Sequence, residues 1–407
     1  MKNTMNRREL LVLLGGLSTA VLWNQPLARA AQELENKAFA NDLLKRGFVI
    51  GDGRKEKGVD KVYASVRVDL PGNIFLGNFA GTEFKKFETT FLTHQIIQNP
   101  VNKDQLIAIQ KWGKNALDIK VRSASVTPLV LPKNTVFFGH GVFTPDAKHF
   151  LVSAMDYDSG HGCLLVYESS SLKCVDRIST YGMNPHELQL SHDGKNYMVM
   201  NSGVPKYQVD RYAKSKVTLQ TNFTKIDVAS GKLVSQVELL HGSKGYAHFF
   251  NIDDKNILAL GLSLDDPNSV QTPSALALIE GEKVTDLMVD SAIKDCIGEA
   301  LSARVMPGGK EALVTFPESD KVAVIDIEKK KVTKTLSMTL PRAVIQTPEP
   351  TLLLLSQSAS GLPFLAYSSK TKDFVDLKKV FDNPKKELHN WAGRGPHGTE
   401  INWPFIA

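Results

Sequence analysis

The chain has 407 residues, of which 42% are hydrophobic and 23% are charged. This balance is ordinary for a globular protein, and it excludes a multi-span membrane protein, a collagen-like chain and a largely disordered chain. The net charge of +6 is too small and too scattered for a nucleic-acid-binding protein, and three cysteines are too few for a disulfide scaffold.

Residues 1–30 have the three parts of an export signal. A basic head is followed by the apolar stretch Leu10–Trp23 and by small residues that predict cleavage before Ala31. The apolar stretch is shorter than the about 20 residues that cross a bilayer, so we expect no integral membrane span after cleavage. The adjacent Arg7 and Arg8 resemble the twin-arginine signal of bacteria, which predicts export to the periplasm in a folded state. An ordinary secretory signal is the alternative.

The rest of the chain repeats short β-strands separated by turn residues. Residues 31–47 are expected to be a lead-in segment, 48–388 a β-propeller and 389–407 a C-terminal tail. Four antiparallel strands recur at a period of about 40 to 60 residues, which is typical of propeller blades. We therefore predict an all-β, seven-bladed β-propeller of the WD40/YVTN-like type, in which residues 48–80 and the C-terminal region form one composite blade. The other six units are expected to start near Phe91, Phe137, Met183, Tyr246, Leu301 and Ala343.

Four histidines keep the same place in successive repeats. His94, His140 and His186 follow one another at intervals of 46 residues, and His248 takes the same place after an insertion. The first strand of each blade lines the central channel, so these positions converge at one mouth of it. Neutral imidazole is a ligand for zinc, copper, iron and nickel. The spacing predicts a transition-metal site, for iron or copper, formed by these four side chains.

Two charged residues accompany the histidines. Glu187 could act as a further ligand or could orient an imidazole from behind, and Arg304, close to the equivalent position of the fifth repeat, could hold an anionic substrate or balance Glu187. Two other interpretations stay open. The histidines could form a structural hydrogen-bond network, as in WD40 units, or their register could be accidental.

Several motifs are absent from the sequence. Without Cys-x-x-Cys-His no covalent haem is expected, and without a glycine-rich strand-to-helix turn no nucleotide is expected. Cys163 and Cys174 flank a predicted hairpin turn, and the sequence leaves open whether they form a disulfide.

Two runs carry a family resemblance. The segment Phe138–Asp146, the tetrapeptide Pro185-His186-Glu187-Leu188 and the His248 segment resemble a family of twin-arginine-exported bacterial propellers, often encoded beside imelysin-type iron-uptake proteins and c-type haem peroxidase-like proteins. The resemblance covers most of residues 50–380 and departs at Ala247, where the family often has arginine. It implies a periplasmic seven-bladed propeller, a role in iron uptake or handling, and imelysin-type partners.

Three functions are therefore under consideration. The first is transition-metal binding at the channel mouth. The second is a docking platform for a periplasmic partner, in which the histidines are structural and loops such as 206–220 make the contacts. The third is a metal-dependent periplasmic enzyme, for which the sequence identifies no catalytic residue.

Overall fold

The computed structural model describes residues 46–51, 71–79, 83–156, 158–203, 221–239, 244–263, 271–357, 364–375 and 398–402. Within these ranges the chain consists of β-strands, turns and one short 3-10 turn, η2 (Pro317–Ser319). The predicted signal of residues 1–30, nearly all of the predicted lead-in segment and the loop 206–220 lie outside the described residues. The all-β prediction is confirmed for the part of the chain that is described.

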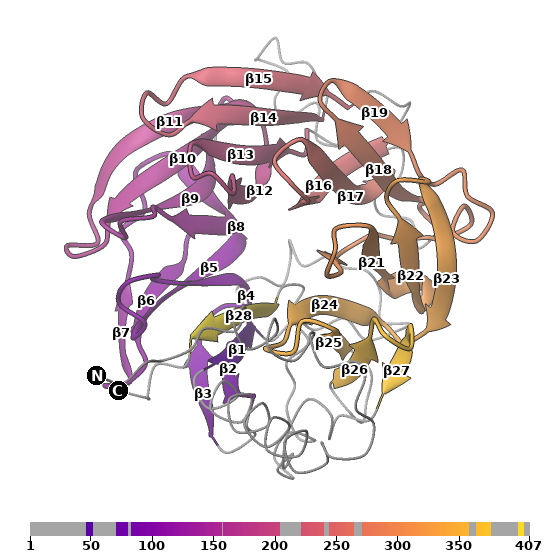
Figure 1. The fold of residues 1–407 in the computed structure, drawn as a ribbon. Coiled ribbons are helices and arrows are strands. Elements are labelled where there is room, and N and C mark those ends of the chain that lie inside the picture. The colour runs from indigo at the N-terminus through magenta and orange to yellow at the C-terminus, as the bar shows by residue number, and fades with distance from the viewer. Residues whose placement is uncertain are drawn as a thin grey trace, which may run out of the picture.

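The strands form five separate four-stranded sheets and one eight-stranded sheet, and these sheets stand around a ring (Figure 1). The first sheet contains β1 (Arg46–Gly51), β2 (Gly72–Asn78), β3 (Phe84–Thr89) and β28 (Gly398–Asn402). The eight-stranded sheet contains β4 (Thr93–Gln98), β5 (Gln105–Gly113), β6 (Ala116–Lys120), β7 (Ser125–Pro128), β8 (Thr135–Phe143), β9 (His149–Asp156), β10 (His161–Glu168) and β11 (Cys174–Met183). The third contains β12 (Pro185–Leu190), β13 (Asn196–Asn201), β14 (Asn222–Asp227) and β15 (Leu233–Glu238). The fourth contains β16 (Lys244–Asn251), β17 (Asn256–Ser263), β18 (Ser274–Glu280) and β19 (Lys283–Asp286). The fifth contains β20 (Ala303–Val305), β21 (Glu311–Phe316), β22 (Lys321–Asp326) and β23 (Lys331–Ser337). The sixth contains β24 (Pro341–Gln346), β25 (Leu352–Gln357), β26 (Phe364–Ser368) and β27 (Asp373–Val375).

Burial falls from the inner to the outer strands of the ring. In β9 six consecutive residues are buried, because neighbouring sheets cover both faces of the strand. In the outermost strands β7 and β15 almost every residue is exposed. Continuous buried runs in middle strands and exposed outer strands are therefore the pattern that a ring of stacked sheets requires.

Apolar clusters join each sheet to the next around the ring. One cluster joins β1 and β2 to β4 and β5, and another joins β9 and β10 to β12 and β13. Further clusters join β13 to β17, β18 to β21, and β22 to β25. A last cluster packs β25 and β26 against β1 and β2. Because each of these clusters takes side chains from two sheets, neighbouring sheets bury each other's faces and the ring is closed.

The ring closes through a composite sheet, as predicted. The C-terminal strand β28 pairs with β1 in antiparallel register, from Arg46 opposite Asn402 to Ile50 opposite Gly398. The assignment of residues 389–407 to a tail outside the propeller is therefore wrong for β28. The predicted boundary failed because a strand that supplies one edge of a distant sheet has no repeat of its own in the local sequence.

The number of separate blades also differs from the prediction. Five four-stranded sheets stand alone, instead of the predicted seven. The remaining eight strands are continuous, because Lys111 and Gly113 of β5 pair with Phe138 and Phe137 of β8. This join is short, and the two halves of the sheet, β4–β7 and β8–β11, still pack face to face through a shared apolar cluster.

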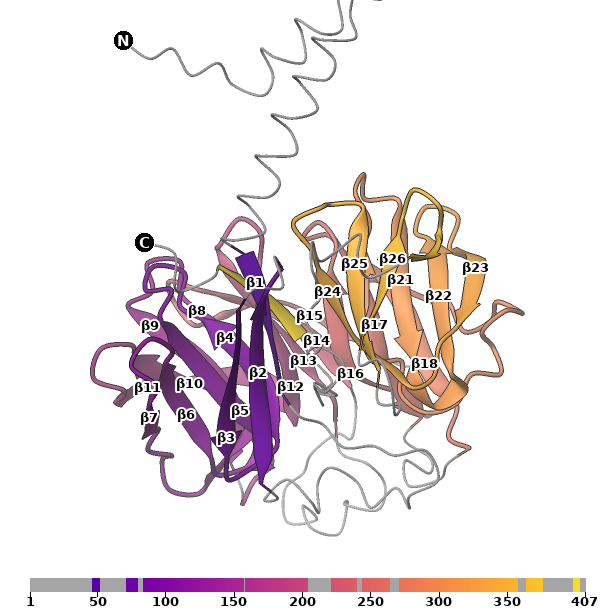
Figure 2. The same ribbon diagram turned by 90° about the horizontal axis from the view of Figure 1, so that it is seen from below.

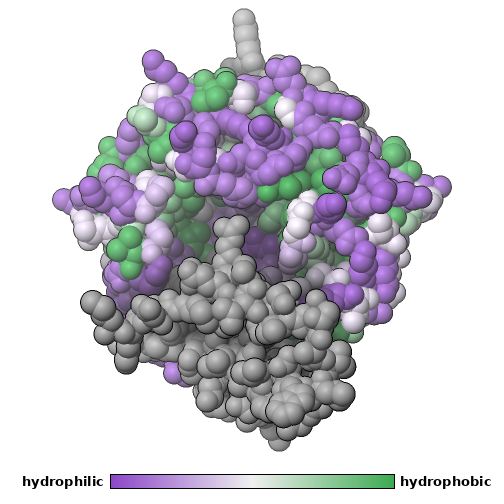
Figure 3. Space-filling view, viewed as in Figure 1, coloured by the Kyte–Doolittle hydropathy of each residue, from purple (hydrophilic) through white to green (hydrophobic). Residues whose placement is uncertain are grey.

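Two further properties concern cysteines and membranes. Cys163, Cys174 and Cys296 are free thiols, so the bridge left open by the sequence is not formed. In the described ranges, no helix has the length and apolar character needed to span a bilayer. Figure 2 shows the strands running through the thickness of the ring, and Figure 3 shows a mainly hydrophilic surface around a hollow at its centre.

Candidate metal centre

The four predicted histidines lie in or beside bulges of the innermost strands. The register of β4 against β5 gains a residue at His94, and that of β8 against β9 is interrupted between Phe137 and Gly141, around His140. The same happens in β12 around His186 and in β16 just before His248. A β-bulge bends its strand and re-aims a side chain. The bulges therefore interrupt the regular alternation of side chains between the two faces of the strand at the positions of the histidines.

The four imidazoles meet in the channel. The ring centroids of His94 and His140 are 4.9 Å apart, those of His140 and His186 are 4.8 Å apart, and those of His186 and His248 are 4.4 Å apart. Even His94 and His248, from sheets that are not neighbours, have centroids only 6.2 Å apart. The exposed fraction ranges from 0% for His140 to 7% for His94. The predicted convergence is therefore found, in an environment closed to bulk water.

Small residues make room for the cluster and tie it to the backbone. Gly139 has a φ of 106°, and a Cβ there would lie 2.6 Å from Cδ2 of His94. The buried Ser153 accepts a hydrogen bond from the His140 amide, 3.3 Å from its nitrogen, and its hydroxyl is 3.1 Å from the His140 carbonyl and 3.3 Å from that of His186. Gly139 therefore lets the His94 ring lie against the backbone of β8. The Ser153 hydroxyl bonds to the backbones of two neighbouring inner strands, β8 and β12.

Glu187 lies behind two of the histidines. Its Oε1 is 3.2 Å from Nδ1 of His140, and its Oε2 accepts a hydrogen bond from Nδ1 of His248 at 3.1 Å. The carboxylate favours a proton on Nδ1 of His140, which leaves Nε2 of that ring as the unprotonated nitrogen. That Nε2 lies 3.1 Å from Nε2 of His94. This is the arrangement in which a carboxylate orients a metal-binding histidine from behind.

His248 differs from the other three because carboxylates contact both of its ring nitrogens. Besides Glu187 at Nδ1, Glu299 places Oε1 3.3 Å from Nε2 of His248. Burial acts to lower the pKa of His248, but the attraction of Glu299 and Glu187 outweighs it and the pKa is raised. For His140 burial prevails over Glu187, and the pKa is lowered. The two rings are thus biased towards different states, His248 towards imidazolium and His140 towards neutral imidazole.

Two overlapping groups have their ligand atoms within 4.8 Å of one another: His94 with His140 and His186, and His140 with Glu187 and His248. The first group could hold a metal ion. Two nitrogens bound to one zinc ion at about 2.0 to 2.1 Å lie about 3.3 Å apart in a tetrahedral site. The 3.1 Å between the Nε2 atoms of His94 and His140 is close to this separation.

Arg304 lies in β20, beside the histidine-bearing β16. Its guanidinium carbon is 5.3 Å from the centroid of the Phe250 ring. In the sheet of β20, the position equivalent to His140 is taken by Ser302 and not by Arg304. The Ser302 amide donates a hydrogen bond to Oγ1 of Thr315 at 3.1 Å, as the His140 amide does to the Ser153 hydroxyl. The role of Arg304 in holding an anion stays a prediction.

Two charged residues of the site were missed from the sequence. Glu299 precedes β20 in an irregular segment, where no periodicity marks it. Arg342 is 7% exposed and lies in a bulge of β24. It could have been found, because Pro341-Arg342 repeats the dipeptide Pro185-His186 at the start of an inner strand.

The comparisons with known proteins concern the family and the fold. The model of the DUF1513 family, described as a protein of unknown function, matches residues 90–383. None of the curated proteins matches the chain. Among solved structures, the chain is similar to the hydrazine synthase of Kuenenia stuttgartiensis, with a TM-score of 0.54 and 13% sequence identity over 75% of this chain and 96% of that one. At this identity the likeness shows the propeller fold alone.

Proposed function

The chain belongs to the DUF1513 family, and for this member we propose that the function is to bind a transition metal, iron or copper, at the mouth of the propeller channel. The observation that carries the proposal is the buried triad of His94, His140 and His186. Three imidazoles supply three nitrogen ligands and leave a coordination position open for a further ligand.

The energetics of burial support a ligand at this place. Polar groups removed from water are costly unless they find partners, and a metal ion would satisfy several imidazole nitrogens at once. The lowered pKa of His140 favours the unprotonated ring, which is the form that binds a metal. Since the ligands come from three successive repeats, a bound metal would also cross-link three parts of the ring.

The other charged groups take supporting roles in this proposal. Glu187 orients His140 and carries the negative charge behind it. His248, predicted as a fourth ligand, is in this arrangement the cationic partner of Glu187 and Glu299. The metal would therefore be held by three neutral imidazoles beside a buried ion-pair cluster.

The proposal extends to architecture and place. We count the eight-stranded sheet as two blades, because its halves pack against each other as neighbouring sheets do, which makes seven blades in all. The twin-arginine signal in residues 1–30 and the resemblance to exported propellers support a periplasmic location. The same resemblance supports imelysin-type iron-uptake proteins as partners and a role in iron uptake or handling.

Metal titration of the anaerobically purified mature protein tests the function. Iron(II) and copper are titrated separately, and one equivalent of one of them is expected to bind. His140→Ala and His186→Ala should weaken binding by more than tenfold. The matched control is His161→Ala, which removes an exposed imidazole at the start of β10. No stoichiometric binding, or equal binding by the channel variants and the control, would refute the proposal.

Location and partner need separate experiments. The full-length chain should be found in the periplasmic fraction, and replacing both Arg7 and Arg8 with lysine should retain it in the cytoplasm. Capture of a purified imelysin-type protein by the metal-loaded propeller would support the partnership. Capture that is unaffected by His140→Ala and His186→Ala would instead favour the docking-platform function.

A further inference from the structure

Arg342 occupies the position in its sheet that His186 occupies in another. Each follows a proline that pairs with the second strand, and each lies two residues before the point where pairing resumes, at Leu188 and Val344. The carbonyl of each also accepts a hydrogen bond from a hydroxyl of the preceding repeat. Ser153 donates to His186 at 3.3 Å, and a threonine hydroxyl donates to Arg342 at 3.0 Å. Equivalent bulges in β12 and β24 therefore carry a histidine in one sheet and an arginine in the other.

The position of Arg342 places a cation on the part of the channel wall that the four histidines leave open. The histidine-bearing strands β4, β8, β12 and β16 succeed one another around the ring (Figure 1), and β20 and then β24 follow them in chain order. The next strand around the ring is β28, which leads back to β4. A side chain that enters the channel from β24 thus faces the cluster from the opposite side.

One buried donor of the Arg342 guanidinium is unsatisfied. Arg342 is 7% exposed, and within the described part of the chain its Nε has no hydrogen-bond partner. Burial lowers the pKa of Arg342, whereas Glu318 and Glu299 oppose this through longer-range attraction and without a hydrogen bond. An arginine carries five donors in a fixed fork and is costly to bury unless they are used. The free Nε therefore points to a ligand that would use the fork.

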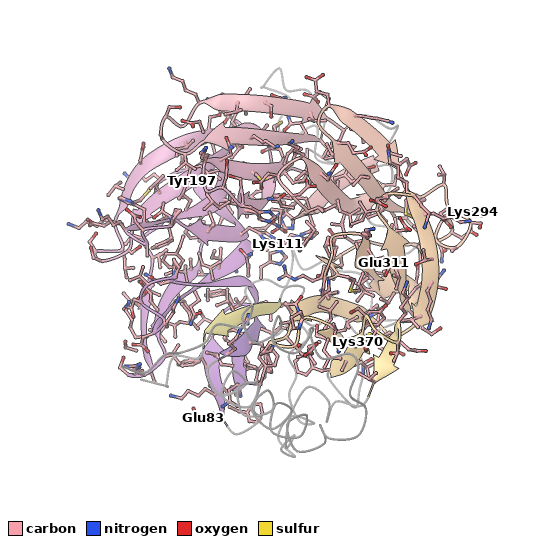
Figure 4. The ribbon with its side chains drawn as sticks, in the orientation of Figure 1. Glu83, Lys111, Tyr197, Lys294, Glu311 and Lys370 are labelled. Carbon is pink, nitrogen blue, oxygen red and sulfur yellow. The ribbon has the colours of Figure 1, made fainter. Side chains whose placement is uncertain are left out.

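The charges around the channel favour an anion once a metal is bound. Arg342 and Arg304 are fixed cations of the inner strands β24 and β20, and Lys111 acts on His140 electrostatically. Figure 4 shows Lys111 at the inner edge of the ring. A divalent cation would add positive charge beside these cations, and an anionic ligand would offset it.

We infer that Arg342 forms an anion subsite beside the histidine triad, which takes the carboxylate group of a small ligand that also occupies the open position of the metal. This inference rests on the proposed function. Carboxylate is the class that fits, because a guanidinium binds its two oxygens in parallel and a carboxylate oxygen is also a good ligand for a transition metal. The bound species would then be a metal–carboxylate complex held between three imidazoles and one arginine.

Cobalt(II), whose visible bands report coordination, is the probe that tests the subsite. Acetate is titrated into the cobalt-loaded protein at constant ionic strength, with chloride as the balancing anion, and a saturable change of the bands is expected. Arg342→Gln should weaken acetate binding by tenfold or more and leave cobalt affinity within threefold. Arg342→Lys, which keeps the charge and loses the fork, should lie between. The control Arg177→Gln removes a guanidinium of β11, whose nearest carboxylate, on Asp156, is 3.6 Å away.

The outcomes separate the subsite from the metal centre. Acetate binding that Arg342→Gln leaves unchanged, or wild-type bands that do not respond to acetate, would overturn the subsite and leave the metal centre standing. A response to inorganic phosphate at lower concentration than to acetate would overturn the carboxylate class. If iron(II), copper and cobalt all fail to bind, the proposed function fails, and the thermal midpoint of the metal-free protein decides the subsite. A thermal midpoint of the wild type that is higher in acetate than in chloride, with the difference lost in Arg342→Gln, supports the subsite. Equal midpoints of the wild type in acetate and chloride overturn it.

Discussion

Replacing Glu187 with glutamine tests the central arrangement of the site most directly. The carboxylate contacts Nδ1 of His140 at 3.2 Å and Nδ1 of His248 at 3.1 Å. Glutamine has nearly the same shape but only one acceptor oxygen, so one of the two imidazole N–H groups would meet an NH₂ group instead. Losing a group that orients a metal ligand costs about 10- to 100-fold in metal affinity. This equals about 1.4 to 2.7 kcal/mol.

The assay is competition for the metal against a chromophoric chelator, with wild type and variants at the same pH and ionic strength. The control is Glu299→Gln, because the Glu299 carboxylate lies 3.3 Å from Nε2 of His248, the histidine outside the triad. If the metal is held by the triad, Glu187→Gln should weaken binding by the stated factor and Glu299→Gln by less than threefold. Equal losses in both variants would show that His248 is a ligand after all. No loss in Glu187→Gln would show that the carboxylate does not orient His140, and the argument from its contacts would be wrong.

Three further predictions concern stability. Gly139→Ala should lower the free energy of unfolding by about 2 kcal/mol or more, because it combines a positive φ with a Cβ 2.6 Å from His94. The control Gly308→Ala has a positive φ but open space around the new Cβ, and it should cost about 1 kcal/mol. Chemical denaturation measures both variants. Ser153→Ala should cost about 1 to 3 kcal/mol in the same assay, because it leaves two buried carbonyls and an amide without that partner. The raised pKa of His248 predicts that its ionised form stabilises the metal-free protein fully below the unfolded-state pKa of about 6.5 and that this contribution is lost as the pH rises through the folded-state pKa. The difference in unfolding free energy between wild type and His248→Gln should therefore shrink between pH 5.5 and pH 9, and a difference that grows would contradict the ion-pair assignment.

Much of the fold was predictable because the repeat is local. Each of the six predicted unit starts lies two residues from the first residue of an inner strand, as with Phe91 and β4 or Ala343 and β24. Strand alternation and turn residues act within a few positions, so a single sequence records them. The composite sheet was expected, but its strand β28 was assigned to a tail, since no neighbouring repeat marks it. The join of β5 to β8 through Lys111 and Gly113 was not predictable, because it depends on where two units meet in space.

The amino-acid sequence is enough to group three of the histidines, because equal spacing in a repeat places His94, His140 and His186 at equivalent points of successive units. The contacts that those histidines make follow from the folded ring. Bulges of unequal length bring successive rings within about 5 Å of each other, Glu187 contacts two of them, and Glu299 comes from a segment without periodicity. The physical reason is that spacing records position along a strand, whereas ligand sets, ion pairs and pKa values depend on distances of a few ångströms across the channel. These distances exist only once all the inner strands have closed around one axis.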